Sequence, residues 1–195
     1  VFYKMAKIFH SRGILTTNEI VDSIDLESAL KFSRPYHITI YAQNKEGLKN
    51  LFRLVSLANT KYLYKIPRIP KSEVIKLREG LILGSGCVNG EIFNAAKSKN
   101  DDELREMMLF YDFIEVNPPS ICEYLVDQGE FTSHEDLITN IRKIINNALA
   151  VEKPICATGD VHQLNKEDTI YRKIIVNQKN YDQFKPGRKN ANVAK

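Results

Sequence analysis

The sequence predicts an α/β protein built on a parallel sheet or barrel, and three observations lead to this prediction. Segments with the two-residue alternation of strands take turns along the chain with segments of helical periodicity. This order is typical of parallel sheets, in which a helix connects each strand to the next. The 195 residues are 43% hydrophobic and 27% charged, as in ordinary globular proteins, and their number suits one domain, or one domain with a piece of another.

Four strands are expected, each bounded by proline, glycine or polar residues. The first is the clearest, because its β-branched and aromatic side chains alternate with polar ones. The second is a short apolar run that leads into a glycine-rich turn, and prolines stand beside the third and the fourth. The expected strands are 36–42, 81–83, 112–116 and 154–158.

Six helices are expected between and after these strands. Apolar residues at helical spacing predict the first, and Ser133, with Asp136 three residues later, predicts an N-cap in a capping-box arrangement for the longest. The expected helices are 45–61, 72–79, 90–97, 101–110, 134–152 and 167–178.

The first 33 residues differ from the rest. Residues 1–12 place apolar side chains on a 3-4 spacing and end at Gly13, which predicts an amphipathic helix closed by a glycine. This helix starts without a capping residue, as if the chain had been cut inside it. Residues 15–33 are polar and mixed, and we expect a linker there.

Composition excludes several classes of protein. The chain has three cysteines, too few and too scattered for a disulfide framework, and their odd number fits a reducing cytoplasm. No apolar run approaches the roughly 20 residues that a membrane span needs, and the start lacks the apolar core of a signal peptide. The net charge of +4 favours polyanionic partners only mildly. We therefore expect a cytoplasmic protein with no membrane partner.

The fourth expected strand leads into a pair of possible metal ligands. Asp160 and His162 follow it, two residues apart, and parallel α/β folds gather their chemistry at such strand ends. Carboxylate oxygen and imidazole nitrogen together suit zinc, manganese or iron. The same pair is also compatible with a turn cap and a surface histidine, because the D-x-H pattern is short and common.

The second expected strand leads into a glycine-rich turn that contains Cys87. Glycines here can cradle a phosphate, although the P-loop pattern is absent. Cys87 stands where a ligand or nucleophile would stand, but a lone cysteine is more often a buried packing residue. Cys122 and Cys156 are interpreted as packing residues.

Two further polar residues lie in expected strands. His37 comes early in the first strand, away from its carboxyl end, so packing or a local hydrogen bond is expected rather than metal ligation. Glu115 in the third strand points the opposite way from Ile114 and is able to approach the site, but such a residue is more often an ordinary polar strand residue.

A basic run interleaved with aromatic residues follows the first helix. Lysines and an arginine alternate there with tyrosines, a pattern found both on nucleic-acid surfaces and on solvated faces. We keep both interpretations, and the candidate nucleic-acid-binding residues are Lys61, Lys65, Arg68 and Lys71.

An ordered series of segments resembles one family. The segments are 42–56, 67–70, 79–87, 110–119, 157–162 and 170–174. Together they are similar to the PHP (polymerase and histidinol phosphatase) domain of PolC-type bacterial DNA polymerase III alpha subunits. The resemblance covers residues 34–178.

This resemblance implies a fold and a metal site. The family fold is a distorted, TIM-like β/α barrel with up to three metal ions at the carboxyl ends of its strands. By that resemblance Cys87, Asp160 and His162 match metal-ligand positions, for zinc or manganese. Residues 1–14 would be the last helix of an inserted 3′–5′ exonuclease, 15–33 a linker, 34–178 the second part of the PHP domain, and 179–195 a tail of unclear structure.

The resemblance also implies a parent enzyme. That enzyme would be a DNA-directed DNA polymerase that uses magnesium, works with DNA and other replisome subunits, and carries this segment as a mainly structural domain. Its first H-x-H motif is absent here, since no two of the four histidines are two residues apart. The alternatives are a free-standing, metal-dependent PHP phosphoesterase and a non-enzymatic nucleic-acid-binding module.

Overall fold

The computed structural model describes residues 35–159 and 161–177, and these form two compact units. Unit 1 contains residues 40–82 with Pro35 and Tyr36, and unit 2 contains residues 37–39 and 83–177. The predictions for residues 1–14, 15–33 and 179–195 lie outside the described residues, and so does Asp160. Among the described helices, none is both long and apolar enough to cross a membrane.

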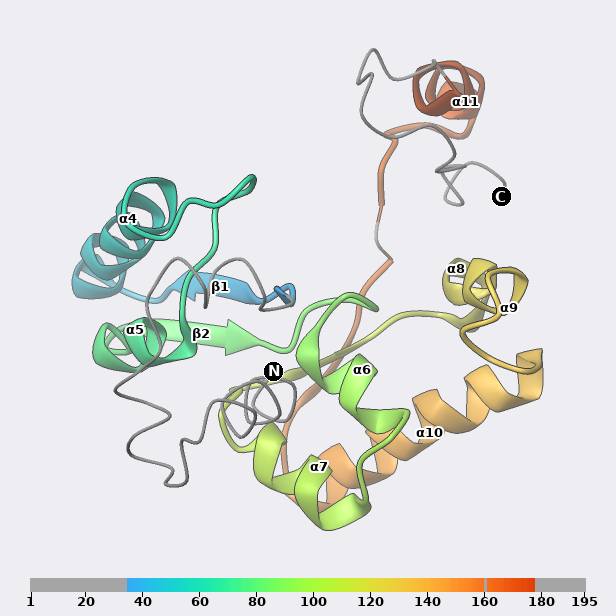
Figure 1. The fold of residues 1–195 in the computed structure, drawn as a ribbon, viewed down its shortest axis with the longest axis horizontal. Helices are drawn as coiled ribbons and strands as arrows, with labels where there is room; N and C mark the ends of the chain where they lie inside the picture. Colours follow the sequence, from blue (N-terminus) through green and yellow to red (C-terminus); the bar gives the residue numbers. More distant parts are fainter. Residues whose placement is uncertain (1–34, 160, 178–195) are drawn as a thin grey trace, which may run out of the picture. The chain divides into compact units, whose positions relative to one another are not determined.

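Unit 1 is built from two helices and most of one strand pair. Strand β1 (Thr39–Ala42) pairs with β2 (Leu81–Gly84), and helices α4 (Lys45–Asn59) and α5 (Lys71–Lys76) come between them in the chain (Figure 1). Asn44 caps α4, because its side chain accepts a hydrogen bond from the amide of Gly47 at 2.9 Å. Helix α4 ends two residues earlier than its pattern predicts.

Unit 2 contains a parallel pair of strands, as the alternation of strands and helices predicts. Strand β3 (Ile114–Val116) pairs with β4 (Ile155–Ala157), with Ile114 opposite Ile155. A parallel bridge joins Gly84 at the end of β2 to Phe113 just before β3. Within residues 35–159 and 161–177 the strands form two two-stranded sheets and do not close into a barrel.

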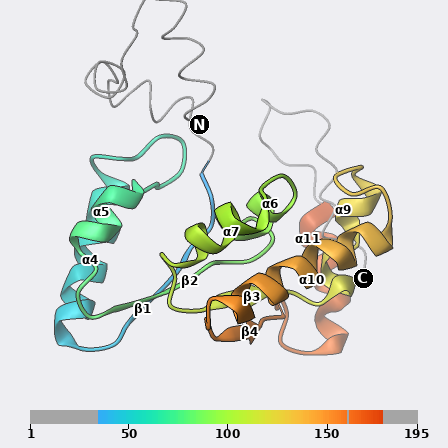
Figure 2. The same ribbon diagram turned by 90° about the horizontal axis from the view of Figure 1, so that it is seen from below.

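Helices cover this strand pair and supply the main core. Helix α10 contacts α6, α7, α8 and β3 (Figures 1 and 2). The helices of unit 2 are α6 (Glu91–Ala96), α7 (Asp101–Met108), α8 (Pro119–Cys122), α9 (Tyr124–Asp127), α10 (His134–Ala150) and α11 (Thr169–Asn177). Fully buried side chains at their contacts include Leu83, Ile92, Leu104, Met108, Ile114, Leu137 and Ile144.

Capping explains where the longer helices begin. The Ser133 hydroxyl accepts a hydrogen bond from the Asp136 amide at 3.1 Å, which confirms the predicted N-cap of α10. The Asp136 carboxylate bonds to Thr132 instead of closing the predicted box on Ser133. Helix α11 begins at Thr169, two residues later than predicted, because a 3-10 turn at Lys166–Asp168, capped by Asn165, comes first.

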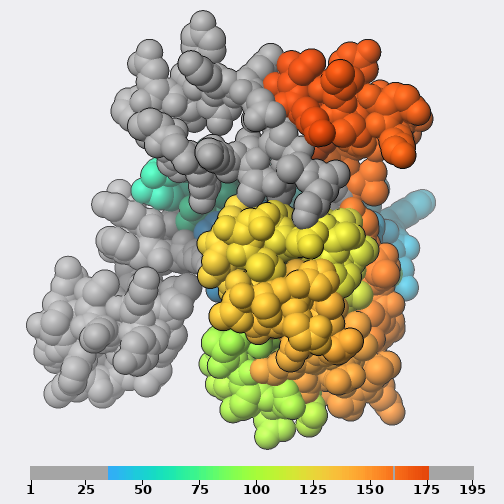
Figure 3. All heavy atoms as spheres, turned by 90° about the vertical axis from the view of Figure 1, so that its right-hand side faces the viewer, coloured from blue at the N-terminus to red at the C-terminus, as the bar shows by residue number. Residues whose placement is uncertain are grey.

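Two features of unit 2 differ from the sequence predictions. Helices α8 and α9 were not expected, and they form one continuous surface with α10 (yellow and orange in Figure 3). The two cysteines interpreted as packing residues also differ in their exposure to solvent. Cys122 is fully buried, as predicted, but Cys156 is exposed, and within the described residues its strand pairs with β3 alone.

Candidate metal centre

The turn after β2 is held in a tight shape by its own backbone. The amide of Gly90 donates to the carbonyl oxygen of Cys87 at 2.7 Å, and the Asn94 side chain donates to the carbonyl oxygens of Val88 and Gly90 at 3.0 and 2.8 Å. Gly86 has a φ of +75°, which favours glycine. The turn therefore presents Cys87 in a fixed, half-buried position.

The structure brings His37 to this cysteine. The Sγ atom of Cys87 lies 3.5 Å from Nδ1 of His37, although 50 residues separate them in the sequence. Backbone contacts hold His37 beside the Cys87 turn. The His37 amide donates to the Asn89 carbonyl oxygen at 3.0 Å, and His37 and Gly90 form an isolated parallel β-bridge. Gly86 makes room, because a Cβ there would lie 2.7 Å from the His37 carbonyl oxygen. The local hydrogen bond that the sequence allows for His37 is thus made to a candidate ligand.

The separation of these two atoms fits a shared metal ion. In tetrahedral zinc sites Zn–S is about 2.3 Å and Zn–N about 2.0–2.1 Å, so a sulfur and a nitrogen ligand lie about 3.5 Å apart. The Cys87 and His37 atoms already stand at that spacing. A thiolate and a neutral imidazole are also the donor types that zinc prefers.

Glu115 reaches the same turn from the middle of β3. Its Oε1 accepts hydrogen bonds from the Gly86 amide at 3.1 Å and from the Thr39 hydroxyl at 2.5 Å. Its Oε2 accepts a hydrogen bond from the Thr158 hydroxyl at 3.4 Å. Of the two interpretations of Glu115, the one in which it approaches the site agrees with this geometry.

The fourth strand is held firmly up to Thr158. The Thr158 amide donates to the Val116 carbonyl oxygen at 2.9 Å, and the buried Asn117 side chain donates to the carbonyl and hydroxyl oxygens of Thr158 at 2.8 and 3.1 Å. The two strand ends that lead into the predicted ligands are not direct neighbours, because β3 pairs with β4 and the residue before β3 bridges the end of β2.

The structure describes two of the three predicted metal ligands, Cys87 and His162. Cys87 stands in the turn after β2, Asp160 lies outside the described residues, and His162 is exposed. Among residues 35–159 and 161–177, no three His, Cys, Asp or Glu side chains gather closely enough to hold an ion. The sequence analysis missed the proximity of His37 to Cys87, because it placed His37 early in a strand, away from the carboxyl end where ligands were expected.

The tyrosines of the basic run in unit 1 contact side chains of the same unit. The Lys65 ammonium and the Arg68 guanidinium lie 5.6 and 5.4 Å from the ring centre of Tyr64, within cation–π range. Tyr62 is buried and donates its hydroxyl hydrogen to Glu73 at 3.1 Å. Lys61 and Lys71 are exposed. The rings thus have structural roles, while the lysines remain candidate phosphate contacts.

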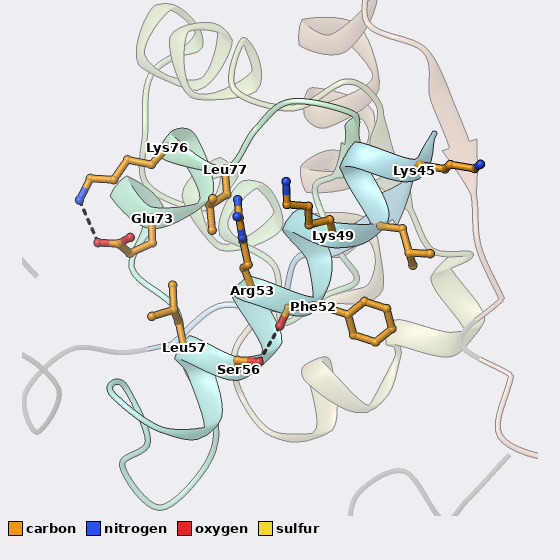
Figure 4. A pocket seen from close by; sticks show the side chains of 10 residues that line it. Lys45, Lys49, Phe52, Arg53, Ser56, Leu57, Glu73, Lys76 and Leu77 are labelled. Carbon is orange, nitrogen blue, oxygen red and sulfur yellow. Dashed lines mark hydrogen bonds and ion pairs between the residues drawn. The ribbon is translucent and has the colours of Figure 1, made fainter.

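Unit 1 also carries an open groove of about 870 Å³ between α4 and α5 (Figure 4). Lys49 and Arg53 extend from α4 along it, whereas Phe52 points away from α5. On the α5 side, Lys76 donates to Glu73 at 2.9 Å, and this bond lowers the pKa of Glu73 and raises that of Lys76. None of the predicted site residues that the structure describes lines the groove.

Comparison with known proteins gives a family and a set of relatives. The PHP domain model matches residues 14–154 of the chain. DNA polymerase III PolC-type of Lacticaseibacillus paracasei is 44% identical over 164 residues, which is 84% of this chain and 11% of that protein. The PolC-type enzymes of Bacillus subtilis and Lactococcus lactis are 42% and 46% identical over 89% and 81% of the chain, and over 12% and 10% of their own length. The chain thus spans about a tenth of these curated relatives.

Proposed function

We infer the function of this chain from its family: it belongs to the PHP domain family, whose model matches residues 14–154. Its similarity to PolC-type DNA polymerase III places it with the PHP domains of those enzymes. We propose that the chain is part of the PHP domain of such a polymerase alpha subunit, and that it completes a distorted, TIM-like barrel together with other parts of the protein.

The proposed biochemical role is a metal-binding domain that supports the polymerase mainly as structure. The observation that carries this role is the pair of Cys87 Sγ and His37 Nδ1 at 3.5 Å, a spacing that suits two ligands of one ion. We propose Cys87, Asp160 and His162 as the ligands that the family resemblance implies, with His37 as the ligand that the geometry adds. Zinc or manganese suits this donor set.

The chain's own residues prepare the site. The tight turn fixes Cys87, and Glu115 and Thr158 connect that turn to the end of β4, from which Asp160 and His162 follow. A divalent ion bound there would link these strand ends and act as a Lewis acid toward phosphate oxygens. With no H-x-H pair among the four histidines, the ligand set supports a structural role better than a free-standing phosphoesterase.

The activity of the whole protein is part of the same proposal. A PolC-type polymerase would extend a DNA primer with magnesium and would use a 3′–5′ exonuclease inserted before residue 15. It would work in the cytoplasm with DNA and other replisome subunits. Residues 34–178 would be the second part of the PHP domain, and residues 1–14 the last exonuclease helix.

Metal titration tests the proposal directly. We expect the 195-residue chain to bind zinc or manganese in a calorimeter, and Cys87→Ser and the double variant Asp160→Ala with His162→Ala to bind more weakly. A wild-type chain that binds neither metal would overturn the proposed role. Phosphoesterase turnover that depends on metal and on these residues would favour the free-standing enzyme instead.

A further inference from the structure

Glu115 makes hydrogen bonds to three segments that are far apart in the sequence. Its carboxylate accepts from Thr39 at the start of β1, from the Gly86 amide in the turn after β2, and from Thr158 at the end of β4. The partners lie 76, 29 and 43 residues away from it. One half-buried side chain therefore joins the first strand, the Cys87 turn and the fourth strand.

The backbone of Glu115 strengthens its hold on the turn. Its amide donates to the hydroxyl of Ser85 at 2.8 Å, and Ser85 is only 1% exposed. Gly84 leaves the space that the carboxylate occupies, since a Cβ there would lie 2.8 Å from Glu115 Oε1. The two residues before Cys87, Ser85 and Gly86, are thus both fixed to Glu115.

The bond to Thr158 has a defined direction. The Asn117 side-chain amide donates to the Thr158 hydroxyl oxygen at 3.1 Å, so the hydroxyl hydrogen is free to point to Glu115 Oε2. The chain of bonds runs from Asn117 through Thr158 to Glu115, which also accepts from Gly86. Such a sequence of donors polarises its members and strengthens each bond.

We propose that Glu115 is a positioning residue for the metal site. It fixes the Gly86 amide beside Cys87 and the Thr39 hydroxyl two residues after His37, so that the Cys87 thiolate and the His37 imidazole face the same ion. This inference rests on the proposed function, which supplies the ion. Groups that hold ligands in place typically change metal affinity by 10- to 100-fold when they are removed.

Three variants of the 195-residue chain test the role. Glu115→Ala removes all acceptors, whereas Glu115→Gln keeps one oxygen that is able to accept from Gly86 and Thr39. Asn147→Ala is the matched control: Asn147 also joins separate segments, accepting from Arg105 at 2.8 Å and donating to Asp101 at 3.0 Å, and its hydrogen bonds within the described part of the chain go to α7 and α10.

The first measurement is titration with Co²⁺ followed by the cobalt–thiolate charge-transfer absorption, a direct signature of Cys87 ligation. We expect Glu115→Ala to bind about 10- to 100-fold more weakly with a reduced band, and Glu115→Gln to recover most of both. Asn147→Ala should keep the wild-type affinity and band. Wild-type affinity and an unchanged band in Glu115→Ala would overturn the inference.

The second measurement needs no metal and separates the two proposals. Hydrogen exchange of the Gly86 amide in the metal-free chain should be faster in Glu115→Ala and return toward the wild-type rate in Glu115→Gln. If the wild-type chain binds no Co²⁺, the proposed function fails, even where the exchange result supports the hold on the turn. If Co²⁺ binds but Gly86 exchanges equally in all variants, only the role of Glu115 is refuted.

Discussion

Gly47 in the first turn of α4 lies directly against Gly80, the residue before β2. A Cβ built on Gly47 would stand 1.8 Å from the carbonyl oxygen of Gly80 and 2.5 Å from its carbonyl carbon. That oxygen already accepts a hydrogen bond from the Gln43 amide at 2.8 Å, and Gly80 has a φ of +69°. Glycine at position 47 is therefore required by close backbone approach, because neither partner is a movable side chain.

Replacing Gly47 with alanine should destabilise the chain. Alanine gains up to about 1 kcal/mol over glycine in a helix, but overpacking against fixed backbone costs about 1–3 kcal/mol, so the clash decides the sign. Urea unfolding measures the change. Gly159→Ala is the control, since among the described residues its Cβ would meet the movable Val161 side chain at 3.2 Å. A Gly47→Ala chain as stable as the wild type would contradict this reasoning.

His37→Ala should weaken zinc binding by at least about tenfold, because the loss of a ligand removes binding free energy directly. Competition with a coloured chelator measures the affinity. The matched control is His134→Ala, an exposed histidine whose Nδ1 lies 3.7 Å from Glu123 Oε1. Equal zinc affinity in His37→Ala and the wild type would show that the imidazole serves only as a hydrogen-bond partner of Cys87.

Local periodicity predicted most of the described elements. The structure confirms the four expected strands and the expected helices α4, α5, α6, α7 and α10. Each of these elements has a periodic pattern that is visible within a short stretch of sequence. Helices α8 and α9 have only four residues each, too few to show a period. The 3-10 turn before α11 is capped by the side chain of Asn165, and a search for apolar periodicity does not detect such a cap.

The site was harder to predict because its contacts are not local. Glycine-rich spacing after a strand was enough to select Cys87, but the pairing with His37 spans 50 residues and depends on how residues 37–39 approach the turn. Glu115 kept two interpretations, because strand alternation gives the face of a side chain and not its partners. The order of the strands, with β3 between β2 and β4, likewise arises only from tertiary packing.

The exposed lysines of the basic run should carry any binding of single-stranded DNA. The logarithm of the DNA association constant falls with the logarithm of the salt concentration, and each lost phosphate contact makes this slope less steep by about 0.7. The triple variant Lys61→Gln, Lys65→Gln and Lys71→Gln should therefore have a slope that is less steep by about 2. Fluorescence anisotropy with an oligothymidylate measures this. The control changes the same charge in the groove, with Lys45→Gln, Lys49→Gln and Lys76→Gln. An unchanged slope in the first triple variant would show that the basic run does not contact DNA phosphates and is an ordinary solvated face.

Tyr111 should make stability fall at alkaline pH. Its hydroxyl donates to Glu91 at 2.9 Å, and burial, followed by the negative charge of Glu91, raises its pKa far above the ordinary value near 10. The folded chain keeps this proton at a pH where the unfolded chain loses it. The contribution to stability is therefore complete below about pH 10 and declines above it, by up to about 1.4 kcal/mol per pH unit.

Comparison of Tyr111→Phe with the wild type isolates this effect. At neutral pH the variant should be less stable by about 1 kcal/mol, the net value of one hydrogen bond. Above about pH 10 the variant has no proton to lose at this position, so the difference should shrink and then reverse. Urea unfolding from about pH 7 to 11 measures both limbs, and Tyr171→Phe, on an exposed face of α11, controls for the loss of a phenol. A difference that stays constant across this range would show that the burial of Tyr111 does not couple its proton to folding.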